Sequence, residues 1–224
     1  MSKSECSNRL KKLSKGSLAV FLAGLEGFER PRVMAEQYTT DSEIAAEVLW
    51  NISLMGDLPV YSGKVSVDLG CGTGILGIGM LLLGTKKVLF VDSDEKALEI
   101  AKKNLEKAKS EYSIGGGAVF LCKDINSFSE RADLVVQNPP FGTKVRHMDK
   151  MFLKKAFESS DLVYSFHKNE TKEFVKKFST ENGFEVTNIF NFDMKLKATF
   201  AHHTRRIKVI KISCFRIAKQ KLFK

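Results

Sequence analysis

The chain has 224 residues, of which 43% are hydrophobic, and a net charge of +10 that suits a polyanionic partner. Its longest uncharged stretch, 69–85, is broken by glycines and short for a membrane span, and no signal peptide opens the chain, so we expect a cytoplasmic protein without membrane contact. The four cysteines form no C-x-x-C pair, and none has a histidine at metal-ligand spacing, which argues against a disulfide framework and a zinc site.

Two helices are predicted before the first strand. Apolar residues at helical spacing between 10 and 25 predict the first helix, which Gly16-Ser17 is expected to interrupt. Thr40-Asp41 is a good N-cap pair, and the apolar positions after it predict a second helix over 44–52. We therefore expect a helical N-terminal extension with a lid segment at 1–40 and one α/β domain at 41–224.

From residue 64 onward, strands and helices alternate. The predicted strands are 64–69, 87–92, 118–122, 133–137 and 162–166, and the predicted helices are 75–83, one from 94 onward, 151–159 and 170–181. Two longer β runs, 184–192 and 206–217, close the chain without a full helix between them. This order predicts a Rossmann-like α/β fold with a mostly parallel seven-stranded sheet and an antiparallel C-terminal hairpin.

A glycine-rich turn follows the first predicted strand. It reads Asp68-Leu69-Gly70-Cys71-Gly72-Thr73-Gly74, which is G-x-G-x-G and not the dinucleotide fingerprint G-x-G-x-x-G. Asp92 ends the second strand, where a carboxylate can accept both hydroxyls of a ribose, and Asp124 after the third strand suits an adenine amino group. Together with the tetrapeptide described next, these residues favour S-adenosylmethionine over a nicotinamide cofactor.

The tetrapeptide Asn138-Pro139-Pro140-Phe141 ends the fourth predicted strand, where open parallel sheets bind ligands. A planar amine conjugated to a ring is a poor nucleophile, and its N–H groups need acceptors. The Asn138 oxygen and a backbone carbonyl held by the two prolines can supply them. Phe141 offers a ring face to a base taken out of its stack. The tetrapeptide therefore predicts methylation of a planar amine, with an ordinary strand-to-turn junction as the structural alternative.

Five segments in this order resemble the methyltransferase-like protein 5 family and its archaeal relatives, from about Gly27 to the C-terminus. They are Glu36-Gln37-Tyr38-Thr39-Thr40, Asp68-Leu69-Gly70-Cys71-Gly72, Asp94-Glu95-Lys96-Ala97-Leu98-Glu99-Ile100, Asn138-Pro139-Pro140-Phe141-Gly142-Thr143-Lys144 and Tyr164-Ser165-Phe166-His167-Lys168. The resemblance implies a class I methyltransferase that uses S-adenosylmethionine to methylate N6 of one adenosine in small-subunit ribosomal RNA.

The same resemblance implies residue roles and a partner. The cofactor-binding positions would be Gln37, Tyr38, Thr40, Asp68, Gly70, Gly72, Thr73, Gly74, Ile75, Asp92, Asp124 and Ile125, and the catalytic positions Asn138, Pro139, Pro140 and Phe141. A usual proline and a usual cysteine of the family are Thr39 and Thr73 here, which puts only fine contacts in doubt. The family also works as a heterodimer with a small zinc-binding activator subunit, docked by strand addition and apolar contact.

Basic residues concentrate at the C-terminus and favour nucleic acid as a partner. Residues 195–224 contain ten Lys and Arg and no acidic residue, a bias that would otherwise mark a solvated basic edge. We predict RNA contacts at Lys144, His167, Lys168, Arg205, Arg206, Lys219 and Lys221.

Other functions stay open at this point. Another planar amine, such as a protein glutamine or guanine N2, could be the acceptor, although Phe141 in place of tyrosine favours a nucleobase. A non-catalytic RNA-binding subunit is disfavoured by the intact Asn138, Asp92 and glycine turn. A nucleotide-dependent dehydrogenase is disfavoured by the missing G-x-G-x-x-G.

Overall fold

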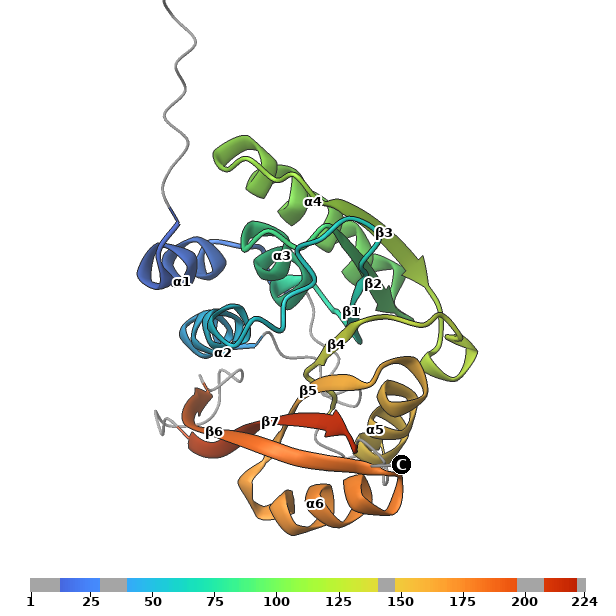
Figure 1. Ribbon diagram of the computed structural model, residues 1–224. Helices are drawn as coiled ribbons and strands as arrows, with labels where there is room; N and C mark the ends of the chain where they lie inside the picture. The colour runs from blue at the N-terminus through green and yellow to red at the C-terminus, as the bar shows by residue number, and fades with distance from the viewer. Residues whose placement is uncertain (1–12, 29–39, 141–147, 197–207, 221–224) are drawn as a thin grey trace, which may run out of the picture.

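A central sheet lies between two layers of helices in the computed structural model, which describes residues 13–28, 40–140, 148–196 and 208–220 (Figure 1). The strands are β1 (Ser66–Leu69), β2 (Lys87–Asp92), β3 (Gly117–Cys122), β4 (Leu134–Gln137), β5 (Leu162–Lys168), β6 (Phe184–Leu196) and β7 (Lys208–Lys219). The helices are α1 (Lys15–Ala23), α2 (Ser42–Leu54), α3 (Ile75–Leu82), α4 (Glu95–Glu111), α5 (Met148–Ser159) and α6 (Lys172–Glu181), with short 3-10 turns η2 (Ile125–Ser127) and η3 (Asn169–Thr171).

The seven strands have the order β3-β2-β1-β4-β5-β7-β6. The first five strands of the chain pair in parallel, and β7 pairs antiparallel with both β5 and β6. This confirms the predicted mostly parallel sheet with its antiparallel C-terminal hairpin. Because β1 pairs with β2 on one side and with β4 on the other, the chain changes direction across the sheet there, and ligands bind at the carboxyl ends of such strands.

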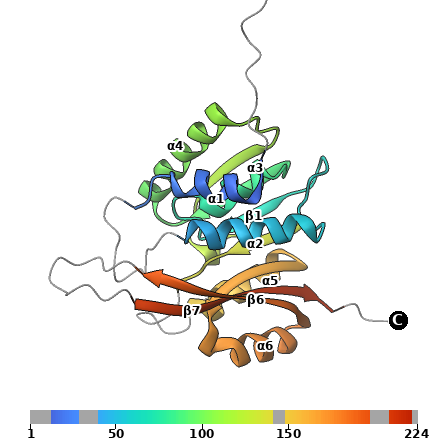
Figure 2. The same cartoon turned by 90° about the vertical axis from the view of Figure 1, so that its left-hand side faces the viewer.

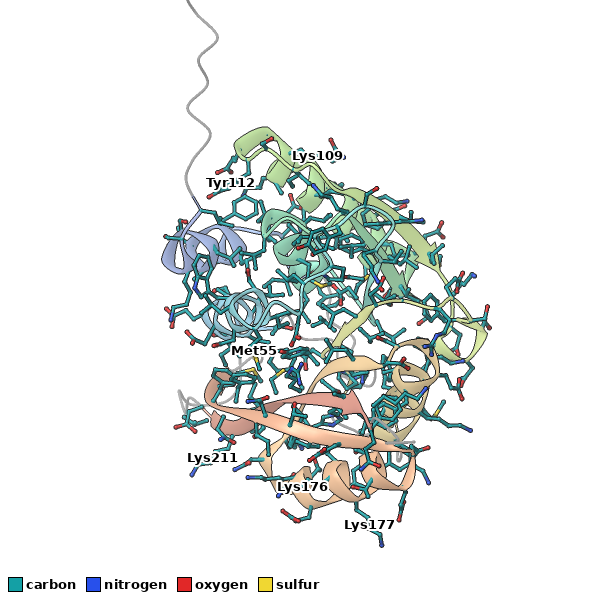
Figure 3. The ribbon with its side chains drawn as sticks, viewed as in Figure 1. Met55, Lys109, Tyr112, Lys176, Lys177 and Lys211 are labelled. Carbon is teal, nitrogen blue, oxygen red and sulfur yellow. The ribbon has the colours of Figure 1, made fainter. Side chains whose placement is uncertain are left out.

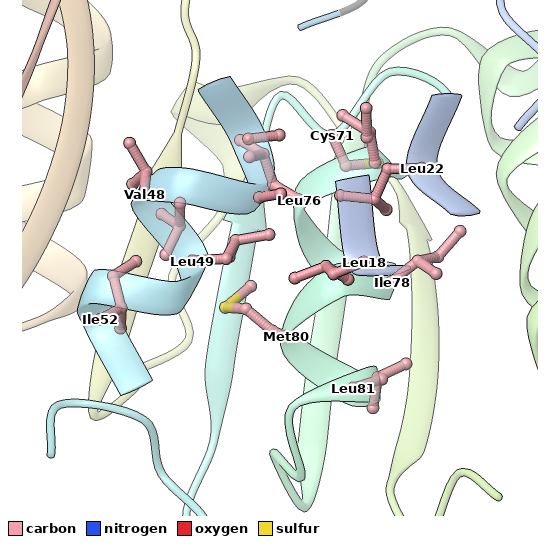
Figure 4. Close-up of a cluster of buried hydrophobic side chains, with 14 of the residues drawn as sticks. Leu18, Leu22, Val48, Leu49, Ile52, Cys71, Leu76, Ile78, Met80 and Leu81 are labelled. Carbon is pink, nitrogen blue, oxygen red and sulfur yellow. The ribbon is translucent and has the colours of Figure 1, made fainter. Parts of the chain in front are cut away.

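Each face of the sheet carries its own core. The first core packs α1, α2, α3 and α4 against the sheet, and Figure 4 shows part of it, with Leu18 and Leu22 of α1 meeting Leu49 of α2 and Ile78 of α3. The second core packs α5 and α6 against the other face. Figure 2 shows α1 beside α2 on the first face. Since α1 shares this core, residues 15–23 pack with the sheet, and a division of the chain at residue 40 stays a prediction.

Two predicted helix starts agree with the structure, and one prediction near the N-terminus is wrong. Asp41 caps α2 by accepting the backbone N–H groups of Glu43 and Ile44, at 3.0 and 3.1 Å, and Asp94 caps α4. The expected interruption at Gly16-Ser17 does not occur, because Ser14 caps α1 in a reciprocal capping box with Ser17. Both residues therefore lie in the first turn of a continuous helix.

Several predicted boundaries in the C-terminal half differ from the observed ones. Helix α5 begins at Met148 and not at 151, and β6 and β7 extend to Leu196 and Lys219. Backbone pairing between β6 and β7 continues beyond the end of β5, where Asp193 lies opposite Lys211, so side-chain pattern alone does not fix the strand ends.

Positive charge is spread over several elements. Figure 3 shows Lys109 on α4, Lys176 and Lys177 on α6, and Lys211 on β7, all pointing away from the body of the protein. In the described ranges, no helix combines the length and the apolar character that crossing a membrane requires.

Candidate active site

The glycine turn after β1 adopts a backbone that only glycine accommodates without strain. Gly70, Gly72 and Gly74 have φ angles of 71°, 52° and 87°, in the left-handed region. Neighbouring rings also approach closely, since a Cβ atom would lie 2.7 Å from the Phe152 ring at Gly70 and 2.8 Å from the Phe28 ring at Gly72. The rings of Phe152 and Phe28 therefore pack directly against the turn and require glycine at these two positions.

Asp92 fixes this turn and keeps capacity to bind a ligand. Its Oδ2 accepts the Gly72 N–H at 2.7 Å, and its Oδ1 accepts the Asp94 N–H at 2.9 Å. Burial raises the pKa of Asp92, and these N–H groups oppose the shift. An ionised carboxylate has about four acceptor positions, so its bonds to backbone N–H groups leave acceptor capacity for the hydroxyls of a ribose. These acceptor oxygens fit the ribose of S-adenosylmethionine, whose hydroxyls are donors.

Asp68 has a structural partner within the turn. It is 1% exposed and accepts the Gly77 N–H at 2.7 Å, which anchors the first turn of α3 to the end of β1. Burial raises the pKa of Asp68 to about 7, the Gly77 bond opposes this, and the charge of Asp92 adds to it. A direct contact between Asp68 and the cofactor stays a prediction.

Asn104 of α4, which no sequence pattern indicates as a site residue, ties the N-terminal segment to the glycine turn. Its Oδ1 accepts the Glu26 N–H at 2.8 Å, and its Nδ2 donates to the carbonyls of Glu26 and Thr73, at 2.9 and 3.0 Å. The side chain is 1% exposed. An asparagine on an amphipathic helix gives no sign of this role in the sequence, because its partners lie far away along the chain.

Replacement of Asn104 by alanine is expected to lower the free energy of unfolding by on the order of 2–3 kcal/mol, because buried backbone groups lose their partners. It should also weaken S-adenosylmethionine binding severalfold, since the Thr73 carbonyl loses its tether. Chemical unfolding with and without cofactor measures both effects. Lys107→Ala is the control, because Lys107 lies on the same helix and its hydrogen bond to the Gly24 carbonyl is exposed to solvent. Equal stabilisation of Asn104→Ala and wild type by the cofactor would contradict the link to the pocket.

Asn138 presents an acceptor without a partner. Its Nδ2 donates to Thr40 Oγ1 at 2.8 Å, which fixes the amide plane. Its Oδ1 is buried and makes no hydrogen bond within the part of the chain that the structure describes. A buried acceptor left unpaired costs about 1–3 kcal/mol, so an N–H donor that enters the site regains this energy. The amide is therefore arranged to receive a donor such as an exocyclic amine.

The structure brings the glycine turn, Asp92 and Asn138 to one edge of the sheet, because β1, β2 and β4 run parallel and end there. Thr73, Ile75 and Ile125 are buried beside or within these loops. Asp124 is exposed at the start of η2, and its Oδ1 already accepts the Asn126 backbone N–H and side-chain amide.

Three predicted cofactor-binding and catalytic residues lie outside the described part of the chain. They are Gln37, Tyr38 and Phe141. Pro139 and Pro140 are described, directly after Asn138, with trans peptide bonds.

His167 is not a surface residue, which corrects its prediction as an RNA contact. It is 1% exposed, and its Nε2 lies 2.7 Å from Ser165 Oγ, which accepts a bond from Gln137 Nε2 at 2.9 Å. Burial lowers the pKa of His167 to about 3, so the ring is neutral. These side chains form a polar network inside the sheet, and its member Gln137 directly precedes Asn138 in sequence.

Tyr164 of the same strand has a structural role as well. Its hydroxyl donates to Asp57 Oδ2 at 2.6 Å, and Arg216 of β7 binds both Asp57 oxygens, at 2.7 and 3.0 Å. This half-buried cluster ties the loop after α2 to β5 and β7. Tyr164 therefore has a structural partner in the loop after α2.

Two other predicted RNA contacts have defined places in the structure. Lys168 is half-buried at the end of β5 and lies 3.6 Å from Glu170. Lys219 is exposed and lies 3.2 Å from Asp161, at the opposite edge of the sheet from Asn138, because β7 runs antiparallel to β5. The remaining predicted contacts, Lys144, Arg205, Arg206 and Lys221, lie outside the described residues.

Comparison with known proteins places this geometry in a family. Residues 51–162 match the family described as methyltransferase small domain. The chain is 34% identical to an uncharacterised protein of Methanocaldococcus jannaschii, over 92% of this chain and 95% of that protein. It is 32% identical to the rRNA N6-adenosine-methyltransferase METTL5 of Danio rerio, over 87% of this chain and 94% of that protein.

Solved structures agree with the sequence comparison. A Pyrococcus horikoshii protein described as a candidate RNA methyltransferase is 39% identical, with a TM-score of 0.81 over 93% of this chain and 99% of that one. The magnesium protoporphyrin IX methyltransferase of Synechocystis with bound S-adenosylmethionine shares the fold at 15% identity, with a TM-score of 0.60 over 92% of each chain.

In the described part of the chain, no group of His, Cys, Asp and Glu side chains is placed to hold a metal ion.

Proposed function

The chain belongs to the family of rRNA N6-adenosine methyltransferases that includes METTL5, and we propose that its substrate is one adenosine of small-subunit ribosomal RNA. It is a methyltransferase that uses S-adenosylmethionine. The observation that carries the proposal is the buried, unpaired Oδ1 of Asn138 beside the glycine turn. An acceptor of this kind fits the N6 amine, which has two N–H donors.

The proposed mechanism assigns the activation of the amine to Asn138. Bound S-adenosylmethionine supplies an electrophilic methyl group. Asn138 Oδ1 accepts an N–H of the amine, and this bond strengthens as the nitrogen gives up its conjugation with the ring and gains positive charge. Pro139 and Pro140 restrict the backbone that carries this side chain. The Asn138 oxygen therefore stabilises the transition state more than it stabilises the bound base.

In the proposed cofactor pocket, Asp92 accepts the ribose hydroxyls with its remaining acceptor capacity. Gly70, Gly72 and Gly74 give the turn its left-handed backbone, and Asp124 with Ile125 lies near the adenine ring. Thr73 and Ile75 complete the turn, and Gln37, Tyr38 and Thr40 contact the cofactor from the segment before α2. The support for these roles is the position of the described residues at the carboxyl ends of β1, β2 and β3.

RNA contact and a partner are part of the same proposal. Lys168 and the basic residues of the C-terminal region would contact RNA phosphate, with Lys219 at the opposite edge of the sheet from Asn138. We propose a heterodimer with a small zinc-binding activator. Supporting this, β3 is an edge strand of the described sheet, and strand addition pairs with the outer backbone groups of such a strand. Val119 of β3 is 37% exposed and could add apolar contact.

Incubation with labelled S-adenosylmethionine and deproteinised small-subunit or large-subunit RNA tests the substrate. The reactions are run with and without a candidate activator. Label in small-subunit RNA alone is the expected result. Label in large-subunit RNA would contradict the proposed subunit, and label in protein would contradict an RNA substrate.

A further inference from the structure

Thr40 contacts Asn138, whereas the resemblance to the family implies only a cofactor contact for this residue. It lies directly before Asp41, the N-cap of α2, and is 6% exposed. Its Oγ1 accepts a bond from Asn138 Nδ2 at 2.8 Å, across 98 positions of the sequence. The capping bonds of Asp41 fix the start of α2, so the Thr40 hydroxyl is held in place by a rigid element.

We propose that Thr40 is a positioning residue that sets the orientation of the Asn138 amide. An asparagine amide has an acceptor oxygen at one end and an NH2 donor at the other. With Nδ2 engaged by Thr40, Oδ1 is the end left unpaired and buried. A half-turn of the amide would exchange the two ends and present NH2 to an amine that is itself a donor. Because a hydroxyl can also donate, Thr40 selects this orientation once its own hydrogen is engaged by another acceptor, since it can then only accept from Nδ2.

The chemistry of the hydroxyl allows this role and a cofactor contact together. A threonine hydroxyl has one donor hydrogen and two acceptor lone pairs. One lone pair accepts from Asn138, and the hydrogen stays available for an acceptor on the cofactor. The two roles predict different kinetic effects. A cofactor contact alone changes cofactor affinity, whereas control of the Asn138 amide changes the methyl-transfer rate when cofactor and RNA are both saturating.

The test compares Thr40→Val, Thr40→Ser, Asn138→Ala and the double variant Thr40→Val/Asn138→Ala. Valine has the shape of threonine without the hydroxyl, and serine keeps the hydroxyl. We expect Thr40→Val to lower the single-turnover rate about 10- to 100-fold at saturating ligands, the scale of a small misplacement of a reacting group. Thr40→Ser should keep most of the rate, and the double variant should be no slower than Asn138→Ala, because both changes act through one side chain.

Calorimetry of S-adenosylmethionine binding to each variant separates the cofactor contact from this role and verifies folding. A wild-type rate for Thr40→Val at saturating cofactor would overturn the inference, as would additive effects in the double variant. Should Thr40→Val fail to fold, Thr40→Ala replaces it in the same cycle.

The inference rests on the proposed function, and the failure of one can be told from the failure of the other. If wild type transfers no methyl group to RNA, the proposed function is overturned and this role with it, whereas full activity of Thr40→Val overturns the role alone.

Discussion

Replacement of Asn138 by alanine is expected to lower kcat about 100- to 1000-fold, by analogy with the loss of one oxyanion-hole hydrogen bond. The Asn138 Oδ1 is buried and unpaired in the described structure, so it is ready to accept an N–H from the amine. Because this bond strengthens as the amine loses conjugation, its removal affects the transition state more than the bound base. Single-turnover methylation at saturating RNA and cofactor measures the effect.

A matched asparagine elsewhere controls for the substitution itself. Asn51 of α2 donates to Glu47 of its own helix, at 2.8 Å to the carbonyl oxygen, and has no part in the proposed site. Asn51→Ala should therefore keep the wild-type rate. If Asn138→Ala also transferred methyl groups at a near-normal rate, residues 138–140 would form a structural turn and the proposed mechanism would be wrong.

Replacement of Asp92 by alanine is expected to weaken S-adenosylmethionine binding by about 2–3 kcal/mol, or roughly 30- to 150-fold in Kd. The carboxylate would lose the proposed bonds to the ribose. It would also lose its present bonds to the N–H groups of Gly72 and Asp94, so the glycine turn would loosen around the cofactor. Both effects act in the same direction. Isothermal titration calorimetry measures the change in affinity directly.

Glu95 provides the control for lost negative charge, because its exposed carboxylate lies three residues after Asp92 at the start of α4. Glu95→Ala should bind the cofactor with nearly wild-type affinity. Unchanged affinity of a folded Asp92→Ala variant would remove Asp92 from the pocket.

The part of the site that follows from strand direction could be predicted from the sequence. The alternation of elements indicates a parallel sheet, and the carboxyl ends of parallel strands meet at one edge. Asp92 and Asn138 each end a strand, so their convergence with the glycine turn follows from the pattern alone. Short polar residues before helices were also informative, since Asp41 and Asp94 cap helices as expected.

The contacts that the sequence did not predict join elements distant in the chain. Asn104 binds Glu26 and Thr73, and Thr40 binds Asn138, through geometry that exists only after the elements pack. His167 illustrates a different difficulty. Strand β5 lies between β4 and β7, and both of its faces are covered. A polar side chain in it is therefore buried on either face of the sheet, which alternation of polar and apolar residues does not reveal.

The most direct test of the central claim is the identity of the methylated nucleoside. Small-subunit RNA is methylated by the protein with its candidate activator, digested to nucleosides and analysed by mass spectrometry against unmethylated RNA. The account predicts N6-methyladenosine at one position, formed by wild type and lost with Asn138→Ala. Methylation of guanine N2, or of a protein glutamine with the RNA unmodified, would contradict it.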